Sequence, residues 1–176
     1  APIKVLDAKK VILTLADNTT NTITDSSRLS TEEDYSAAIY SKEDLIINGN
    51  GTLNVNAGYR NGIKSTDDCI IVSGTLIITS TEDGIIGKDL CGIVAGDINI
   101  NAGSDGIKST YDTDTTKGNV IIEGGNITIK ASNDGIQAEN ILVINDGAIN
   151  IKTNNGAADT TQTHTDNMYM GRGGFG

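Results

Sequence analysis

A short motif recurs along the chain at intervals close to 22 residues, and no other feature constrains the fold as strongly. In each copy a small residue precedes an apolar one, and the small residue occupies positions 38, 62, 84, 106, 135 and, in a weaker copy, 156. The successive spacings are 24, 22, 22, 29 and 21 residues, and the longest interval contains a polar insert over 110–117. A fixed period of this length is typical of solenoids, in which each repeat stacks on the next.

Two further strand-like segments follow the motif in each repeat. An apolar run such as 69–72 comes first, then a glycine turn such as 73–74, then an alternating strand such as 76–79. Three short strands separated by turns correspond to one coil of a β-helix. A leucine-rich repeat would need several spaced leucines, and a propeller blade would need about twice this period. The sequence therefore predicts an all-β, right-handed, single-stranded parallel β-helix with about five to six coils of ~22 residues.

Alignment of the repeats tests this prediction, because equivalent residues of a parallel β-helix lie about 4.8 Å apart on successive coils. Inward positions should then form apolar ladders, and three such ladders are found: Ile39, Ile63, Ile85, Ile107 and Ile136; Leu53, Leu76, Ile98, Ile127 and Ile149; and Val55, Ile78, Ile100, Ile129 and Ile151. The residues between the last two ladders are mostly polar, as outward positions of a strand should be.

The repeats divide the chain into three parts of one domain. We expect an irregular N-terminal coil or cap over 1–36, the β-helix repeats over 37–156, and a polar, then glycine-rich tail over 157–176. Cys69 and Cys91 occupy one ladder position. We favour buried thiols over a disulfide here, because side chains in register on parallel strands point the same way.

The formal net charge of −10 limits the classes of partner. It argues against nucleic acid and against anionic membrane surfaces, both of which attract basic patches. No segment is long and apolar enough to be inserted in a bilayer, and the chain opens without a signal peptide. An acidic chain of this kind has either a solvated acidic surface or oxygen atoms collected to hold cations.

Aspartates gather on both sides of the motif. Asp83, Asp105 and Asp134 precede it in three successive repeats, and Asn61 takes their place one repeat earlier. A second acidic group follows the motif and consists of Glu43, Asp44, Asp67, Asp68, Asp89, Asp112, Asp114 and Glu139. A Ca²⁺ ion fits between two carboxylates stacked about 4.8 Å apart. The alternative is that each aspartate caps a turn of its own backbone. Zinc is disfavoured because the one histidine, His164, lies in the tail.

A mixed polar column lies between the two acidic groups. Its members are Tyr40, Lys64, Ile86, Lys108 and Gln137, with Arg60 close by. These side chains are either solvated surface groups or a row of contacts for an extended polymer. We take Tyr40, Arg60, Lys64, Lys108 and Gln137 as the candidate substrate-binding residues.

Several motifs together resemble a known family. They are Ala38-Ile39-Tyr40-Ser41-Lys42, Gly62-Ile63-Lys64-Ser65-Thr66-Asp67-Asp68, Asp83-Gly84-Ile85-Ile86-Gly87-Lys88-Asp89, Asp105-Gly106-Ile107-Lys108-Ser109 and Asp134-Gly135-Ile136-Gln137-Ala138-Glu139. In order and spacing they resemble the polysaccharide-lyase-like, carbohydrate-binding β-helix proteins of cellulolytic bacteria, over residues 35–153.

The resemblance implies a secreted or cell-surface protein with a pectate-lyase-like fold. It implies binding of cellulose and of acidic sugars such as polygalacturonate, bound Ca²⁺, and no demonstrated catalysis. The calcium candidates carried over are Asp67, Asp68, Asp83, Asp89, Asp105 and Asp134, to which the insert adds Asp112.

Three functions are therefore considered. The first is a non-catalytic module in which Ca²⁺ bridges the protein and the carboxylates of an acidic polysaccharide. The second is a weak calcium-dependent lyase with Lys64 or Lys108 as the base. The third is a structural or adhesive solenoid that Ca²⁺ only stiffens. The sequence favours the first function.

Overall fold

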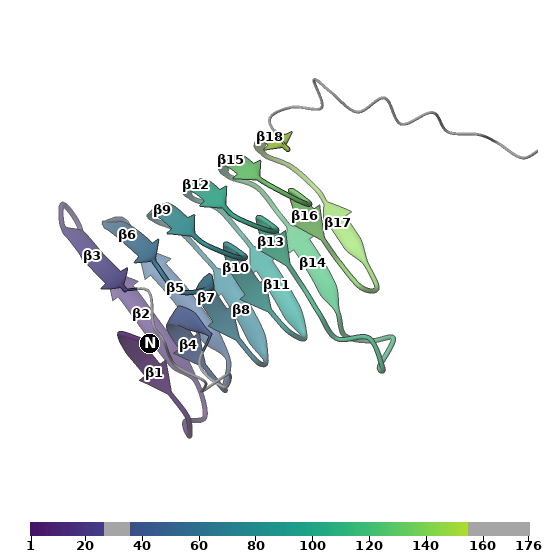
Figure 1. Cartoon of the computed structure of the whole chain (residues 1–176), viewed down its shortest axis with the longest axis horizontal. Coiled ribbons are helices and arrows are strands. Elements are labelled where there is room, and N and C mark those ends of the chain that lie inside the picture. Colours follow the sequence, from purple (N-terminus) through teal and green to yellow (C-terminus); the bar gives the residue numbers. More distant parts are fainter. Residues whose placement is uncertain (27–35, 155–176) are drawn as a thin grey trace, which may run out of the picture.

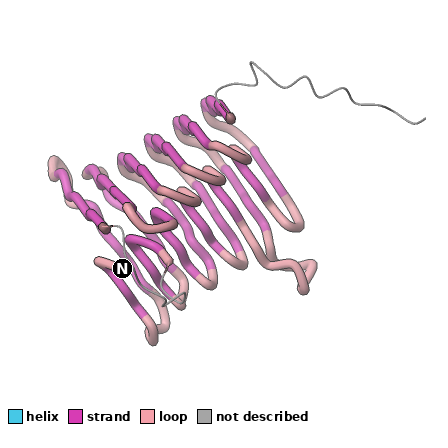
Figure 2. Tube along the Cα trace, in the orientation of Figure 1, coloured by secondary structure: helices cyan, strands magenta, loops and turns pink. Residues whose placement is uncertain are grey.

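The computed structural model describes residues 1–26 and 36–154, and every regular element in these ranges is a β-strand (Figures 1 and 2). The strands form three parallel sheets of six strands each. Sheet A contains β1 (Ile3–Val5), β4 (Ala37–Ser41), β7 (Asn61–Ser65), β10 (Ile85–Gly87), β13 (Ile107–Lys108) and β16 (Ile136–Gln137). Sheet B contains β2 (Val11–Leu15), β5 (Leu45–Gly49), β8 (Asp68–Ile71), β11 (Leu90–Ile93), β14 (Asn119–Ile122) and β17 (Leu142–Ile144). Sheet C contains β3 (Thr20–Asp25), β6 (Thr52–Ala57), β9 (Thr75–Ser80), β12 (Asp97–Ala102), β15 (Asn126–Ala131) and β18 (Ala148–Thr153).

The chain visits sheets A, B and C in turn, so each strand pairs with the strand three elements later. This winding confirms the predicted parallel β-helix, and Figure 1 shows the coils stacked side by side along the long axis of the molecule. No helix that could cross a membrane is found among the residues described.

The strand register confirms the apolar ladders. Ile85 pairs with Ile63 on one side and Ile107 on the other. Ile98 likewise pairs with Leu76 and Ile127. These side chains are buried between the three sheets, where isoleucine fills the interior and its β-branched shape suits an extended strand.

The N-terminal segment, which we expected to be an irregular coil, contributes one strand to each sheet. β1 pairs with β4, β2 with β5 and β3 with β6, all in parallel. Exposed and partly buried residues alternate over short stretches in β1 and β2. The register of the three strands is set by their pairing with the second coil. The predicted tail at 157–176 lies outside the described residues.

The glycine of the motif is required by close packing between coils. A Cβ atom on Gly84 would lie 2.5 Å from the carbonyl oxygen of Gly106, and a Cβ on Gly106 would lie 2.5 Å from that of Gly135. Neither glycine has a positive φ. The motif therefore uses glycine for its missing side chain, and the backbones of successive coils approach where it stands.

The two cysteines are free thiols on paired strands, as predicted. Cys91 of β11 pairs with Cys69 of β8, and both are buried. Burial raises the pKa of Cys91 to about 12 and raises the pKa of Cys69 well above its usual value. Both therefore stay protonated near neutral pH and behave as small apolar residues of the core.

Candidate functional site

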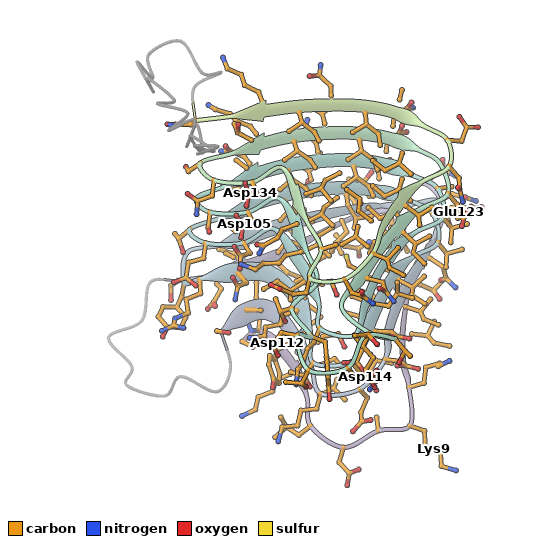
Figure 3. The ribbon with its side chains drawn as sticks, turned by 90° about the vertical axis from the view of Figure 1, so that its right-hand side faces the viewer. Lys9, Asp105, Asp112, Asp114, Glu123 and Asp134 are labelled. Carbon is orange, nitrogen blue, oxygen red and sulfur yellow. The ribbon has the colours of Figure 1, made fainter. Side chains whose placement is uncertain are left out.

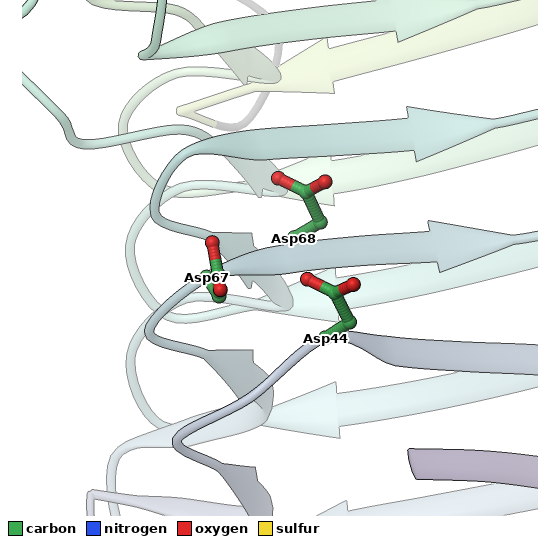
Figure 4. A group of neighbouring side chains, drawn as sticks. All are labelled: Asp44, Asp67 and Asp68. Carbon is green, nitrogen blue, oxygen red and sulfur yellow. The ribbon is translucent and has the colours of Figure 1, made fainter. Parts of the chain in front are cut away.

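Three aspartates converge where the chain turns from sheet A into sheet B. Asp68 begins β8, Asp44 directly precedes β5, and Asp67 lies in the turn between β7 and β8. Each offers one carboxylate oxygen, and these oxygens lie within 4.8 Å of one another. Figure 4 shows Asp44 and Asp68 on successive coils with Asp67 beside them. We call these three residues the acidic cluster.

A repeated serine shapes the turn that carries the cluster. The hydroxyl of Ser65, at the end of β7, accepts a hydrogen bond from the backbone N–H of Asp67 at 3.1 Å and donates to the carbonyl oxygen of Glu43 at 2.9 Å. One coil earlier, the hydroxyl of Ser41 likewise accepts from the N–H two residues on, that of Glu43, at 3.1 Å, and it donates to the carbonyl oxygen of the same Glu43 at 2.7 Å. Each serine stands three residues before a cluster aspartate, so the local hydrogen bonds fix where the carboxylates emerge.

The carboxylates destabilise one another when no cation is bound. Burial raises the pKa of Asp67, and a hydrogen bond with Asp89 and the charge of Asp44 raise it further. Burial also raises the pKa of Asp68, together with the charges of Asp44 and Asp89. The cluster is therefore under electrostatic strain that a proton or a metal ion would relieve.

Lysines neutralise the two outer ends of this acidic region. The ammonium of Lys10 lies 3.6 Å from Asp44, and that of Lys117 lies 2.5 Å from Asp89. Across the ranges that the structure describes, no ion pair is found for Asp67 or Asp68. A bound cation would therefore be stabilised most between Asp67 and Asp68, the two carboxylates without an ion-pair partner among the described residues.

The cluster has the donor chemistry of a calcium site. Three carboxylates offer as many as six oxygen atoms, and Ca²⁺ takes six to eight oxygen ligands at about 2.3–2.6 Å. Protein zinc sites are built mainly from histidine nitrogen and cysteine sulfur, and the cysteines here are enclosed in the core. The residues fit Ca²⁺, with the remaining positions open to water or to a ligand oxygen.

The aspartates that precede the motif stack as predicted but bond to the backbone. Asp83 accepts a hydrogen bond from the N–H of Asp105 at 3.0 Å, and Asp105 accepts one from the N–H of Asp134 at 3.0 Å. In the same way, Oδ1 of Asn61 accepts a hydrogen bond from the N–H of Asp83 at 3.0 Å. Figure 3 shows Asp105 and Asp134 one above the other. This geometry favours the capping interpretation of the column over the metal-ligand one.

The aspartates of the insert are not members of the cluster. Asp112 is exposed, and Asp114 accepts hydrogen bonds from the backbone and the hydroxyl of Thr116, which lower the pKa of Asp114. Figure 3 shows both at the corner of the molecule away from Asp105 and Asp134. Asp89 of the predicted downstream group adjoins the cluster, because its backbone N–H donates to the carbonyl oxygen of Asp67 at 3.2 Å.

The predicted substrate-binding column is in register but is not an open track. Tyr40 pairs with Lys64, which pairs with Ile86, and Lys108 and Gln137 continue the column. However, Tyr40 and Ile86 are each only 4 % exposed, which breaks the column into separate parts.

The cations of this column are engaged within the protein. Lys64 donates to the hydroxyl of Ser36 at 3.3 Å, and burial lowers the pKa of Lys64, partly offset by the charge of Asp83. Lys108 forms an ion pair with Asp105 at 2.7 Å. The guanidinium carbon of Arg60 lies 5.6 Å from the centre of the Tyr59 ring. The Nε atom of Arg60 lies 3.8 Å from Oε1 of Glu82, with which it forms an ion pair.

Two features of the site were not singled out from the sequence. Asp44 joins the cluster although it was noted only as one member of the wider acidic group, and Lys117 of the insert reaches Asp89 from 28 residues away. The serine three residues before Asp44 and before Asp68 is a signal that could have paired these two aspartates. No equivalent signal exists for Lys117, because the insert has no counterpart in the other repeats.

Comparisons with known proteins agree with this architecture. A solved polysaccharide lyase-like protein from C. thermocellum, a gadolinium derivative, superposes with a TM-score of 0.73 at 32% identity, covering 87% of this chain and 67% of that one. A carbohydrate-binding domain-containing protein of Acetivibrio thermocellus is 39% identical over 82 residues, which is 44% of this chain and 29% of that protein. The chain thus matches under a third of this curated relative's length.

The stacked coils of this chain thus share the β-helix architecture of a polysaccharide lyase-like protein. The family model for carbohydrate-binding domain-containing proteins matches residues 1–173. The chain belongs to this family of carbohydrate-binding domain-containing proteins, as the sequence motifs indicated.

Proposed function

We propose that this protein binds acidic plant cell-wall polysaccharides such as polygalacturonate through Ca²⁺ held by the acidic cluster, without catalysing a reaction on them. The observation that carries the proposal is the convergence of Asp44, Asp67 and Asp68 with no ion-pair partner for the two central carboxylates within the described residues. Family membership supports the carbohydrate partner. We place the protein outside the cell, where such polymers occur.

Calcium reconciles an acidic protein with an acidic sugar. The net charge of −10 would repel a polyuronate, and this repulsion must be overcome locally. A Ca²⁺ ion with three protein carboxylates retains free coordination positions that uronate oxygens can fill.

Cellulose, the other expected polymer, would bind elsewhere because it is neutral. The outer face of sheet C carries exposed polar residues such as Asn99 and Thr128, and it includes a shallow depression of about 300 Å³ bordered by Asp97 and Asn126. Amide and hydroxyl groups of this kind can exchange hydrogen bonds with sugar hydroxyls. We therefore assign any cellulose binding to sheet C and acid-sugar binding to the acidic cluster.

The surroundings of the lysines support a non-catalytic role. A lyase would need a free base beside the metal-bound sugar. The charged groups acting on Lys64 are Asp83, Arg60, Glu82 and Lys88, and none belongs to the acidic cluster. Lys108 is paired with Asp105. Neither lysine is therefore set up to remove a proton from a sugar held at the cluster.

Retention on immobilised polygalacturonate tests the proposal. We expect calcium-dependent retention that a chelator abolishes and that Asp68→Asn weakens by about tenfold or more, since one ligand charge is lost. Asp17→Asn is the matched control, because it removes one exposed carboxylate from the turn between β2 and β3, at the corner between sheets B and C and not at the corner that carries the cluster. Equal retention with and without chelator would refute the calcium bridge, and ultraviolet absorbance of unsaturated product would refute the non-catalytic assignment.

A further inference from the structure

We propose that Lys117 is a built-in counter-ion whose ammonium occupies a second cation position, beside Asp89, and so restricts the acidic region to one divalent ion. This inference rests on the proposed function, because it concerns the same acidic region. It assigns a role to the insert, which interrupts the repeat between the third and fourth glycines of the motif at positions 106 and 135.

The ammonium of Lys117 contacts the Asp89 carboxylate where a bound metal ion would contact it. Its Nζ lies 2.5 Å from Oδ2 of Asp89, and the backbone N–H of Asp89 donates to the carbonyl oxygen of Asp67, a member of the acidic cluster, at 3.2 Å. Asp89 is only 8 % exposed, so its charge is largely removed from water and needs a partner. The ammonium of Lys117 neutralises the Asp89 carboxylate. Without it, a metal ion could bind at Asp89, one coil beyond Asp67 and Asp68.

The insert holds the lysine in place from several sides. The backbone N–H of Lys117 donates to the carbonyl oxygen of Asp114 at 3.0 Å, and the next N–H, of Gly118, donates to the carbonyl oxygen of Asp89 at 2.7 Å. The ammonium also lies 4.9 Å from the ring centre of Tyr111. The loop backbone therefore brings Lys117 next to Asp89, and the Tyr111 ring lies beside the ammonium.

Oxygen atoms beyond those of Asp89 line the same space. A depression of about 420 Å³ is bordered by Asp67, Asp68, Asp89, Lys117 and Asn119, among others. The Oδ1 atom of Asn119 is buried and accepts no hydrogen bond, which is costly for an amide oxygen. Without the ammonium, the carboxylates that border this depression would lack a positive partner and would suit a second Ca²⁺ ion.

Calcium titration of the wild type and Lys117→Met by calorimetry tests the inference, with thermal melting in calcium and in chelator as a second readout. In the titration we expect one Ca²⁺ ion per wild-type chain and two per Lys117→Met chain. In thermal melting we expect the Lys117→Met variant to have a lower Tm than wild type in chelator and to regain the lost Tm in calcium. Lys88→Met is the matched control, because Lys88 contacts the same Tyr111 ring at 4.8 Å but has no ion pair with Asp89 among the described residues. It should bind one ion.

A double variant guards against a failure to fold. Asp89→Asn with Lys117→Met removes both charges together, so it should fold in chelator and bind one ion. The inference is overturned if Lys117→Met binds the same number of ions as wild type, or if neither protein binds any. If the wild type binds none and Lys117→Met binds one, the second position stands and the calcium site of the proposed function falls.

Discussion

Asp68 and Asp83 are aspartates at repeating positions of adjacent coils, yet their carboxylates meet different surroundings. Asp83 lies where the next coil presents a backbone N–H, and its carboxylate is used to accept that hydrogen bond. Asp68 lies at a corner where the neighbouring groups are other carboxylates. Residue type alone did not separate these roles, because both positions satisfy the spacing of a stacked acidic column.

Substitution of Asp83 should distinguish capping from metal binding. Asp83→Ala leaves the N–H of Asp105 without its acceptor and should lower the free energy of unfolding by about 1–3 kcal/mol. Asp83→Asn keeps an acceptor oxygen, as Asn61 does one coil earlier, and should cost little. Urea denaturation in chelator measures both. Equal losses for the two variants would contradict the capping role, because they would show that the negative charge is what matters.

At the scale of the element, each coil is held at a fixed distance from the next, and the motif strand is one of the places where the backbones approach closely. The Asp-Gly-Ile motif combines three requirements of that contact. The aspartate caps the next coil, the glycine permits close approach, and the isoleucine fills the interior. The motif therefore recurs because stacking repeats the same contact in every coil.

Adding one methyl group at this contact should be costly. In Gly106→Ala the new Cβ would lie 2.4 Å from Cγ2 of Ile129 and 2.5 Å from the carbonyl oxygen of Gly135, so the coils must separate. We expect a loss of about 1–3 kcal/mol in the free energy of unfolding. Gly124→Ala is the control, since its nearest neighbour would be 3.4 Å away. Comparable denaturation midpoints for the two variants would show that close approach is not the reason for the glycine.

At the scale of the molecule, the coils differ in how many neighbours they have. Strands in the middle, such as β9 and β12, pair on both sides, whereas β17 and β18 pair on one side. The ladder residues of the last coil are also uncovered by any described residue, and Leu142, Ile144 and Ile151 are 48, 48 and 42 % exposed. Stability in a solenoid depends on contacts between neighbouring repeats, so it should fall toward this end.

Amide hydrogen exchange should reveal this gradient. We expect the amides of β9 and β12 to exchange only through near-global unfolding, and those of β17 and β18 to exchange faster by about tenfold or more. Ile100 and Ile151 provide a matched pair, because they occupy the same ladder position in a central coil and in the last coil. Uniform protection along the solenoid would indicate that the last coil is covered or that the molecule opens as one unit.

The fold could be predicted from the sequence because a solenoid repeats its local contacts. Each ladder position is sampled in every coil, so Ile85 and its equivalents reveal the inward face by comparison alone. The family resemblance followed from the same motifs. The first coil was harder to predict, since β1 to β3 lack the motif and depend on pairing with the second coil for their register.

The sequence by itself determined the period, the inward ladders and the concentration of carboxylates beside the motif, because these depend on residue spacing along one chain. Only the tertiary structure decided which carboxylates meet each other and which meet a backbone N–H. It also decided that Lys117, at the end of the insert, forms an ion pair with Asp89 of the preceding coil. The physical reason is range: burial and charge interactions depend on distances of a few ångströms in space, and turns and insertions alter those distances without changing the repeat.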